Sequence, residues 1–264
     1  MDLSTIVGLI LALVILVVVL IMDGGSPAEL FAHPSAIILI VGGSLMATTV
    51  ASPLEVMLRI PKMLMISAKD EKFDIQGAIE RIASMADKAR RDGLLALEEE
   101  SKKIDDAFLK RGIMMVVDGV DPSQVKAILM ANITQMKNRH KAGYEMFAAA
   151  GAFAPTFGII GTVMGLISVL KQLDDPNKLA TSIAGAFLAT LWGLLTANLL
   201  YLPMGGKLKA KSTAEVNYRV MLMEGILAIQ AGENPRIIRE KLGSYLPPAV
   251  LAKAAQGEAA AEKA

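Results

Sequence analysis

Four apolar segments, at residues 3–22, 34–51, 148–170 and 179–202, constrain this chain more than any other feature. Each is close to the roughly 20 residues that a helix needs to cross about 30 Å of hydrocarbon. None of them contains Asp, Glu, Lys, Arg or His. We therefore predict an all-α, polytopic membrane protein with four transmembrane helices. The first segment has an acidic residue before it and no small-residue cleavage site after it, so we expect it to be retained.

The segments divide the 264 residues into four regions. We predict transmembrane helices 1 and 2 in residues 1–51, a cytoplasmic helical domain in 52–147, transmembrane helices 3 and 4 in 148–203, and a cytoplasmic helical extension in 204–264. Apolar residues recur at helical spacing from Ile75 to Ala86, and Gly93 is a favourable helix end. After Pro248 the chain is low in complexity and rich in Ala, and we expect a disordered or frayed tail.

Basic residues indicate the orientation. The 52–147 insert has 16 Lys and Arg residues, 9 follow residue 202, and the only two elsewhere are Lys171 and Lys178. Because basic residues near the ends of membrane spans favour the cytoplasmic side, we predict that the insert, the N-terminus and the C-terminus are cytoplasmic, in a bacterial cytoplasmic (inner) membrane.

The composition argues against several classes of function. The net charge of +1 does not suggest nucleic-acid binding, and there is no cysteine for a disulfide or thiolate site. The two histidines stand alone, and no phosphate-binding loop or paired carboxylates are visible. We predict no enzyme activity and no cofactor. If the protein moves ions, a partner must supply the titratable group.

Small residues follow the last two apolar segments at helical spacing. They permit close helix packing in lipid, where van der Waals contact drives association. Packing within one chain and a contact between copies in a homo-oligomer both fit the pattern. The residues are Gly161, Gly165, Gly185, Ala189, Gly193 and Ala197.

Two threonines lie at similar depth in these segments. Thr162 is 14 residues from the start of its segment and Thr190 is 13 residues before Pro203 in an antiparallel one, which places both about 20 Å from the same membrane face. In one interpretation each hydroxyl bonds the carbonyl four residues earlier in its own helix. In the other, the pair supplies oxygen ligands along a cation path.

Two prolines interrupt the same helices. Pro155 removes the amide that would bond the carbonyl of Gly151, and Pro203 does the same to Leu199. A static kink and a hinge are both consistent with this pattern.

Taken together, the motifs APTFGIIGTVMGL and ATLWGLLTANLLYLP and the insert segment ARRDGLLALEEE resemble the MotA/PomA family of flagellar motor stator subunits. The related TolQ and ExbB proteins share the PTxGxxGTVxG pattern but have three spans. The resemblance implies a homo-oligomer, a pentamer, around a dimer of a single-span MotB/PomB-like subunit that donates an aspartate, with H⁺ or Na⁺ flow driving rotation. It implies that Thr162 and Thr190 belong to the ion pathway, and that Pro155 and Pro203 couple ion flow to movement.

The resemblance also implies a rotor interface at Arg90 and Glu98, with Arg91 and Glu99 beside them, facing a rotor protein of the FliG type. From the residues alone, Arg90 and Arg91 complement the dipole at a helix end and the glutamates suit a solvated face. An ion-driven energiser of the TolQ/ExbB kind and a non-conducting membrane scaffold remain the alternative functions.

Overall fold

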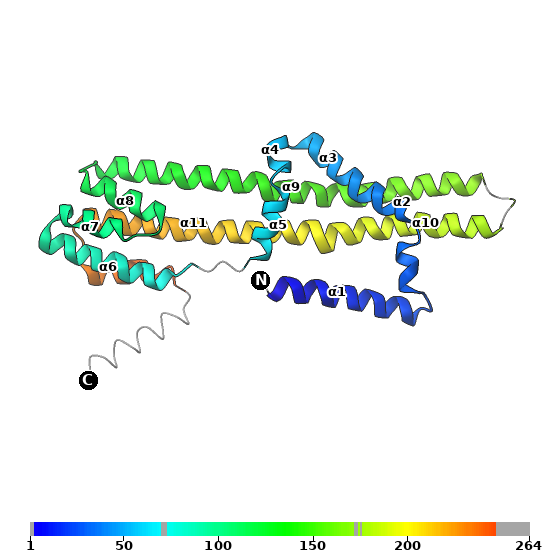
Figure 1. Cartoon of the computed structure of the whole chain (residues 1–264), viewed down its shortest axis with the longest axis horizontal. Coiled ribbons are helices and arrows are strands. Elements are labelled where there is room, and N and C mark those ends of the chain that lie inside the picture. Colours follow the sequence, from blue (N-terminus) through cyan, green and yellow to red (C-terminus); the bar gives the residue numbers. More distant parts are fainter. Residues whose placement is uncertain (1–2, 70–72, 172–173, 175, 247–264) are drawn as a thin grey trace. The chain divides into compact units, whose positions relative to one another are not determined.

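The computed structural model describes residues 3–69, 73–171, 174 and 176–246, and all regular secondary structure within them is helical (Figure 1). Contacts group residues 1–70 with 139–210 in a first unit, and 71–138 with 211–264 in a second. Four helical stretches are long and apolar enough to cross a membrane, which confirms the predicted all-α fold with four spans. The Ala-rich tail lies outside the described residues.

The first unit contains the apolar helices. In chain order it contains one long helix, a short 3₁₀ helix, a second span made of three consecutive helical pieces, and two short helices. Parts of two longer helical stretches complete it. The elements outside those two stretches are α1 (Leu3–Met22), η1 (Pro27–Phe31), α2 (Pro34–Ile37), η2 (Ile38–Gly42), α3 (Gly43–Ala51), α4 (Leu54–Met57) and α5 (Ile60–Ala68). The short helices α4 and α5 therefore group with the spans, although the sequence pattern placed their residues in the insert.

Two long helical stretches carry the third and fourth spans. Helix α9 (Pro122–Leu170) begins well before the apolar segment, and Asp121 caps it by accepting a hydrogen bond from Ser123 N at 2.8 Å. The fourth span is α10 (Pro176–Leu195), η4 (Thr196–Tyr201) and α11 (Leu202–Gln230) in direct succession. This helical stretch ends two residues before Gly232, which adopts φ +69°.

The second unit is a helical domain with its own core. Helices α6 (Ile75–Asp92), α7 (Leu97–Lys102), α8 (Ala107–Val117) and α12 (Pro235–Gly243), with the turn η3 (Leu94–Ala96), pack with the adjoining parts of α9 and α11. Asp74, Asp106 and Asn234 cap α6, α8 and α12 through their side-chain oxygens. Gly93, at φ +84°, ends α6 as predicted.

Close packing of α9 against α10 uses the predicted small residues. A Cβ added at Gly193 would lie 2.8 Å from the carbonyl oxygen of Ala154 and 3.1 Å from Gly158 Cα, and one added at Gly165 would lie 2.7 Å from Ala186 Cβ. These contacts are within one chain, so the intramolecular interpretation is confirmed for this face. A contact between copies stays a prediction.

The two prolines have different local consequences. Helix α9 continues through Pro155, which lies half-buried in the first unit. Pro203 is exposed and follows the π-helical turn η4, in which Leu202 N–H bonds the carbonyl of Ala197, five residues earlier. The wide turn shifts the hydrogen-bond register immediately before the residue that has no amide hydrogen. The sequence pattern did not reveal this turn.

We predict that Gly193→Ala destabilises the first unit. The new methyl group would meet backbone atoms of α9, which cannot move aside as a flexible side chain can, and overpacking of this kind costs roughly 1–3 kcal/mol. The melting temperature of the detergent-purified protein should fall. Gly42→Ala is the matched control, because an added Cβ there meets nothing within 4 Å. Equal melting temperatures for the two variants would contradict the packing argument.

Candidate functional site

The hydroxyl groups of Thr162 and Thr190 are in direct hydrogen-bond contact across α9 and α10. This contact confirms the estimate that the two residues lie at matched depth. Thr162 Oγ1 also lies 3.1 Å from the carbonyl oxygen of Gly158, four residues earlier, and 3.0 Å from that of Ala186 on the facing helix. The own-helix bond and the cross-helix pair are therefore both present at Thr162.

The two hydroxyl groups of this cluster have more acceptor lone pairs than hydrogens, so some lone pairs accept no hydrogen bond. A hydroxyl has one hydrogen and two acceptor lone pairs. If Thr162 donates to a carbonyl, Thr190 must donate to Thr162, and the lone pairs of Thr190 are then free to accept. The cluster thus offers neutral oxygen ligands without a fixed charge, which suits transient contact with a cation.

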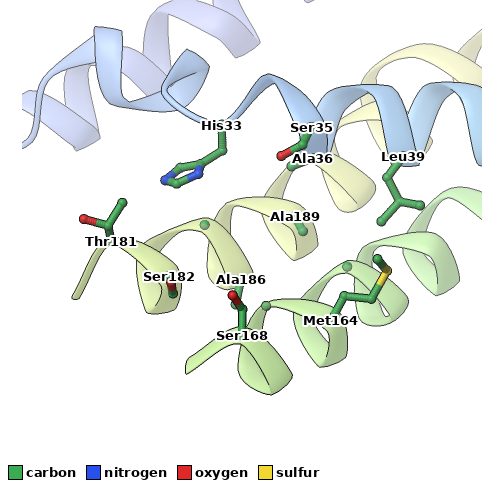
Figure 2. A pocket seen from close by; sticks show the side chains of 13 residues that line it. His33, Ser35, Ala36, Leu39, Met164, Ser168, Thr181, Ser182, Ala186 and Ala189 are labelled. Carbon is green, nitrogen blue, oxygen red and sulfur yellow. The ribbon is translucent and has the colours of Figure 1, made fainter. Parts of the chain in front are cut away.

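A cavity of about 340 Å³ lies beside this cluster, between α2, α9 and α10 (Figure 2). Side-chain hydroxyls and small residues form most of its wall, and His33 is the one titratable group among its described lining residues. Figure 2 shows His33 at the start of α2 pointing toward α10. The lining residues are His33, Ser35, Ala36, Leu39, Gly161, Met164, Gly165, Ser168, Thr181, Ser182, Gly185, Ala186 and Ala189.

Sequence reasoning did not place His33 here. A Cβ added at Gly185 would lie 2.9 Å from His33 Nδ1, so the small residue at 185 makes room for the imidazole ring. Helical periodicity describes contacts along one segment, but it gives no information about which loop residue covers a distant helix. The glycine at 185 is the one available signal in the sequence, and its spacing from Ala189 and Gly193 fits helix packing equally well.

Two aromatic side chains hold the neighbouring helices in place. Trp192 Nε1 donates to the carbonyl of Leu30 at 2.8 Å and its ring lies 5.6 Å from that of Phe31, which ties η1 to α10. The Tyr201 hydroxyl lies 3.3 Å from Ser44 Oγ in a buried contact between η4 and α3. These contacts support the helices that carry the threonine pair.

The predicted rotor-facing charges lie on the surface of the second unit. Arg90 and Arg91 are in the last turn of α6, where Arg91 Nη2 lies 2.8 Å from Asp87 Oδ2. Arg90 is exposed and has no ion-pair partner within the described parts of the chain. Glu98 and Glu99 are in the first turn of α7 and are also exposed.

Lysines surround the acidic turn of α7. Lys102 Nζ lies 2.7 Å from Glu99 Oε1 and 4.0 Å from Glu98 Oε1. Its hydrogen bond lowers the pKa of Glu99 below the ordinary value for a glutamate, and the pKa of Lys102 is raised in turn. Glu100 accepts from Lys88 at 2.8 Å, which lowers the pKa of Glu100. Both carboxylates stay ionised at neutral pH, so the surface presents fixed charges of both signs.

The structure thus forms two separate groups from the predicted site residues. The hydroxyl pair lies in the first unit, with Pro155 in the same helix as Thr162 and Pro203 two residues beyond the end of η4. The four charged residues lie in the second unit, around the junction of α6 and α7.

Comparison with known proteins identifies the family. Residues 100–221 match the model of the MotA/TolQ/ExbB proton channel family. Motility protein A of Bacillus subtilis (strain 168) is 40% identical over 261 residues, covering 98% of this chain and 96% of the relative. The chemotaxis protein PomA of Vibrio alginolyticus is 39% identical over 252 residues, covering 93% and 96%.

A solved structure agrees with the sequence comparison. The structure of the flagellar MotAB stator complex from Bacillus subtilis contains a chain that matches with a TM-score of 0.88 and 38% identity, over 94% of this chain and 97% of that one. Identity at this level over nearly the whole length extends the resemblance drawn from the Pro155 and Pro203 motifs. The chain belongs to the motility protein A family.

Proposed function

We propose that this protein is the ion-conducting A subunit of a bacterial flagellar stator, and that it couples H⁺ or Na⁺ flow to torque on the rotor. The observation that carries the proposal is the Thr162–Thr190 hydroxyl pair between two charge-free spans. Such a pair offers oxygen ligands to a passing cation and cannot itself release a proton at physiological pH. The hydroxyls are compatible with sodium and with protons, so the proposal covers both ions.

The charge-free spans require a partner. A dimer of a MotB/PomB-like single-span subunit would supply an aspartate, whose burial in hydrocarbon is costly unless it is protonated or paired with an ion. The solved relative from Bacillus subtilis is a MotAB stator complex, which supports this choice of partner. We further propose that copies of this chain form a pentameric ring around that dimer.

The proposed orientation is multi-pass in the inner membrane, with both termini and the charged domain in the cytoplasm. The concentration of basic residues in 52–147 and after residue 202 supports it. There, Arg90, Arg91, Glu98 and Glu99 would meet charged residues of a FliG-type rotor protein. Exposed charges are screened beyond about 8 Å at physiological salt, so they act only in close, transient contact, as a stepping interface requires.

A pull-down from the native membrane tests the identity of the partner. The stator proposal expects a single-span protein with a peptidoglycan-binding domain to co-purify with this chain. Recovery of an envelope energiser's partner in its place would favour the TolQ/ExbB-like alternative. Reconstituted complexes that carry no ion flux would favour the non-conducting scaffold.

We predict that Thr162→Val and Thr190→Val reduce ion-driven rotation or change its ion preference while the complex still assembles. Valine keeps the shape but removes the oxygen, and an unsatisfied buried polar contact costs about 1–3 kcal/mol. Rotation speed in sodium and proton gradients is the measurement. Thr49→Val is the control, because Thr49 Oγ1 bonds the carbonyl of Leu45 in its own helix. Unchanged speed and ion dependence in both variants would contradict a role in conduction.

We predict that Arg90→Glu and Glu98→Lys reduce torque without unfolding the protein. Both side chains are exposed, and exposed charges and surface ion pairs contribute little to stability. Yield, melting temperature and ion flux should stay near those of the parent protein while stall torque falls. Glu80→Lys is the charge-reversal control on the same domain. It reverses a charge that pairs with Arg239 of α12 at 2.9 Å and that is not among the proposed rotor-facing residues. Loss of the folded complex in the Glu98→Lys variant would favour a structural role.

A further inference from the structure

Helices α4 and α5 form a short, largely apolar segment directly after the second apolar span. Helix α3 ends at Ala51 and α4 begins at Leu54, so the segment starts beside the end of a membrane helix. Its inner side packs on the first unit. A Cβ added at Gly143 of α9 would lie 2.9 Å from Met63 Sδ, and Ser67 Oγ lies 3.1 Å from Met204 Sδ of α11. The segment therefore crosses α9 and α11 (Figure 1).

The opposite side of this segment exposes large apolar residues. Leu54, Leu58 and Met65 are 64%, 73% and 67% exposed, values far above those of core residues. This side is not simply the outer surface of a water-soluble domain, where contiguous apolar groups of this size are uncommon. Some other apolar medium or surface must cover it.

Basic side chains lie among these apolar residues. Arg59 and Lys62 are exposed, and no described residue forms an ion pair with either. The sequence has no acidic residue from Val56 to Lys69, while Glu55 precedes this stretch. Apolar side chains flanked by unpaired cations are the pattern of a helix that lies in the headgroup region of an anionic membrane.

We propose that α4 and α5 dock on anionic lipid at the bilayer surface, with Leu54, Leu58 and Met65 in the acyl boundary and Arg59 and Lys62 at the lipid phosphates. Because only two residues separate α3 from α4, the end of the span holds the segment at headgroup depth. The assignment of this surface to the inner leaflet rests on the proposed orientation; the docking does not depend on the stator function. A neighbouring copy of the chain would need to pair the two cations with acidic groups, whereas anionic headgroups supply that charge directly.

A single spin label on the full-length protein tests the docking. The chain has no cysteine, so Leu58→Cys gives one labelling site, and Met65→Cys serves as a second if the first variant folds poorly. The protein is placed in nanodiscs of phosphatidylcholine with or without phosphatidylglycerol. Collision with oxygen reports lipid contact, and collision with a water-soluble nickel chelate reports exposure to water. Leu95→Cys is the control, because Leu95 is 75% exposed on the other unit.

We expect phosphatidylglycerol to shield the label at position 58 from the nickel chelate and leave the label at position 95 accessible. Arg59→Gln and Lys62→Gln should each lower the ratio of docked to undocked label about five-fold. Glu55→Gln should shift that ratio in the opposite direction. A label that stays open to water in both lipids would overturn the proposal. Equal protection in both lipids that is insensitive to all three charge variants would also overturn it, and dilution with unlabelled protein would then reveal a neighbouring copy.

Discussion

The close approach of the α9 and α10 backbones is the interaction on which the membrane part of this protein depends. In lipid there is no hydrophobic force between helices, so association relies on van der Waals contact and on hydrogen bonds across the interface. Gly158, Gly165 and Gly193 remove the side chains that would separate the backbones. Only at this separation can the short hydroxyl side chains of Thr162 and Thr190 meet. The same contact that holds the helices together also creates the neutral oxygen cluster proposed for the ion path.

The groups proposed for ion conduction and the groups proposed for torque lie in different parts of the chain. The spans have no Asp, Glu, Lys, Arg or His, so the titratable step is assigned to a partner carboxylate, while the exposed residues of α6 and α7 carry fixed charges of both signs. The lysines around α7 lower the pKa values of Glu99 and Glu100. Acidification toward those lowered values would be needed to neutralise them, so this surface keeps its charge throughout the physiological pH range.

Sequence patterns predicted the parts of this structure that depend on local rules. Span length and apolarity located the four membrane helices, the glycine at 93 located one helix end, and the rise per residue placed the two threonines at one depth. Features that depend on contacts between distant segments were not predictable in this way. The position of His33 over Gly185, the π-helical turn before Pro203 and the crossing of α5 over two long helices are of this kind. The family resemblance, and not the residue pattern, singled out Arg90 and Glu98.

In the proposed function, these spans supply oxygen ligands for the ion but no carboxylate. Ion flux into proteoliposomes tests it most directly, with this chain alone, with its single-span partner, and with a partner whose membrane aspartate is replaced by asparagine. The account predicts flux only with the unmodified partner, since no residue of the spans can replace the missing carboxylate. Equal flux through this chain alone, or through the complex with the asparagine partner, would contradict it.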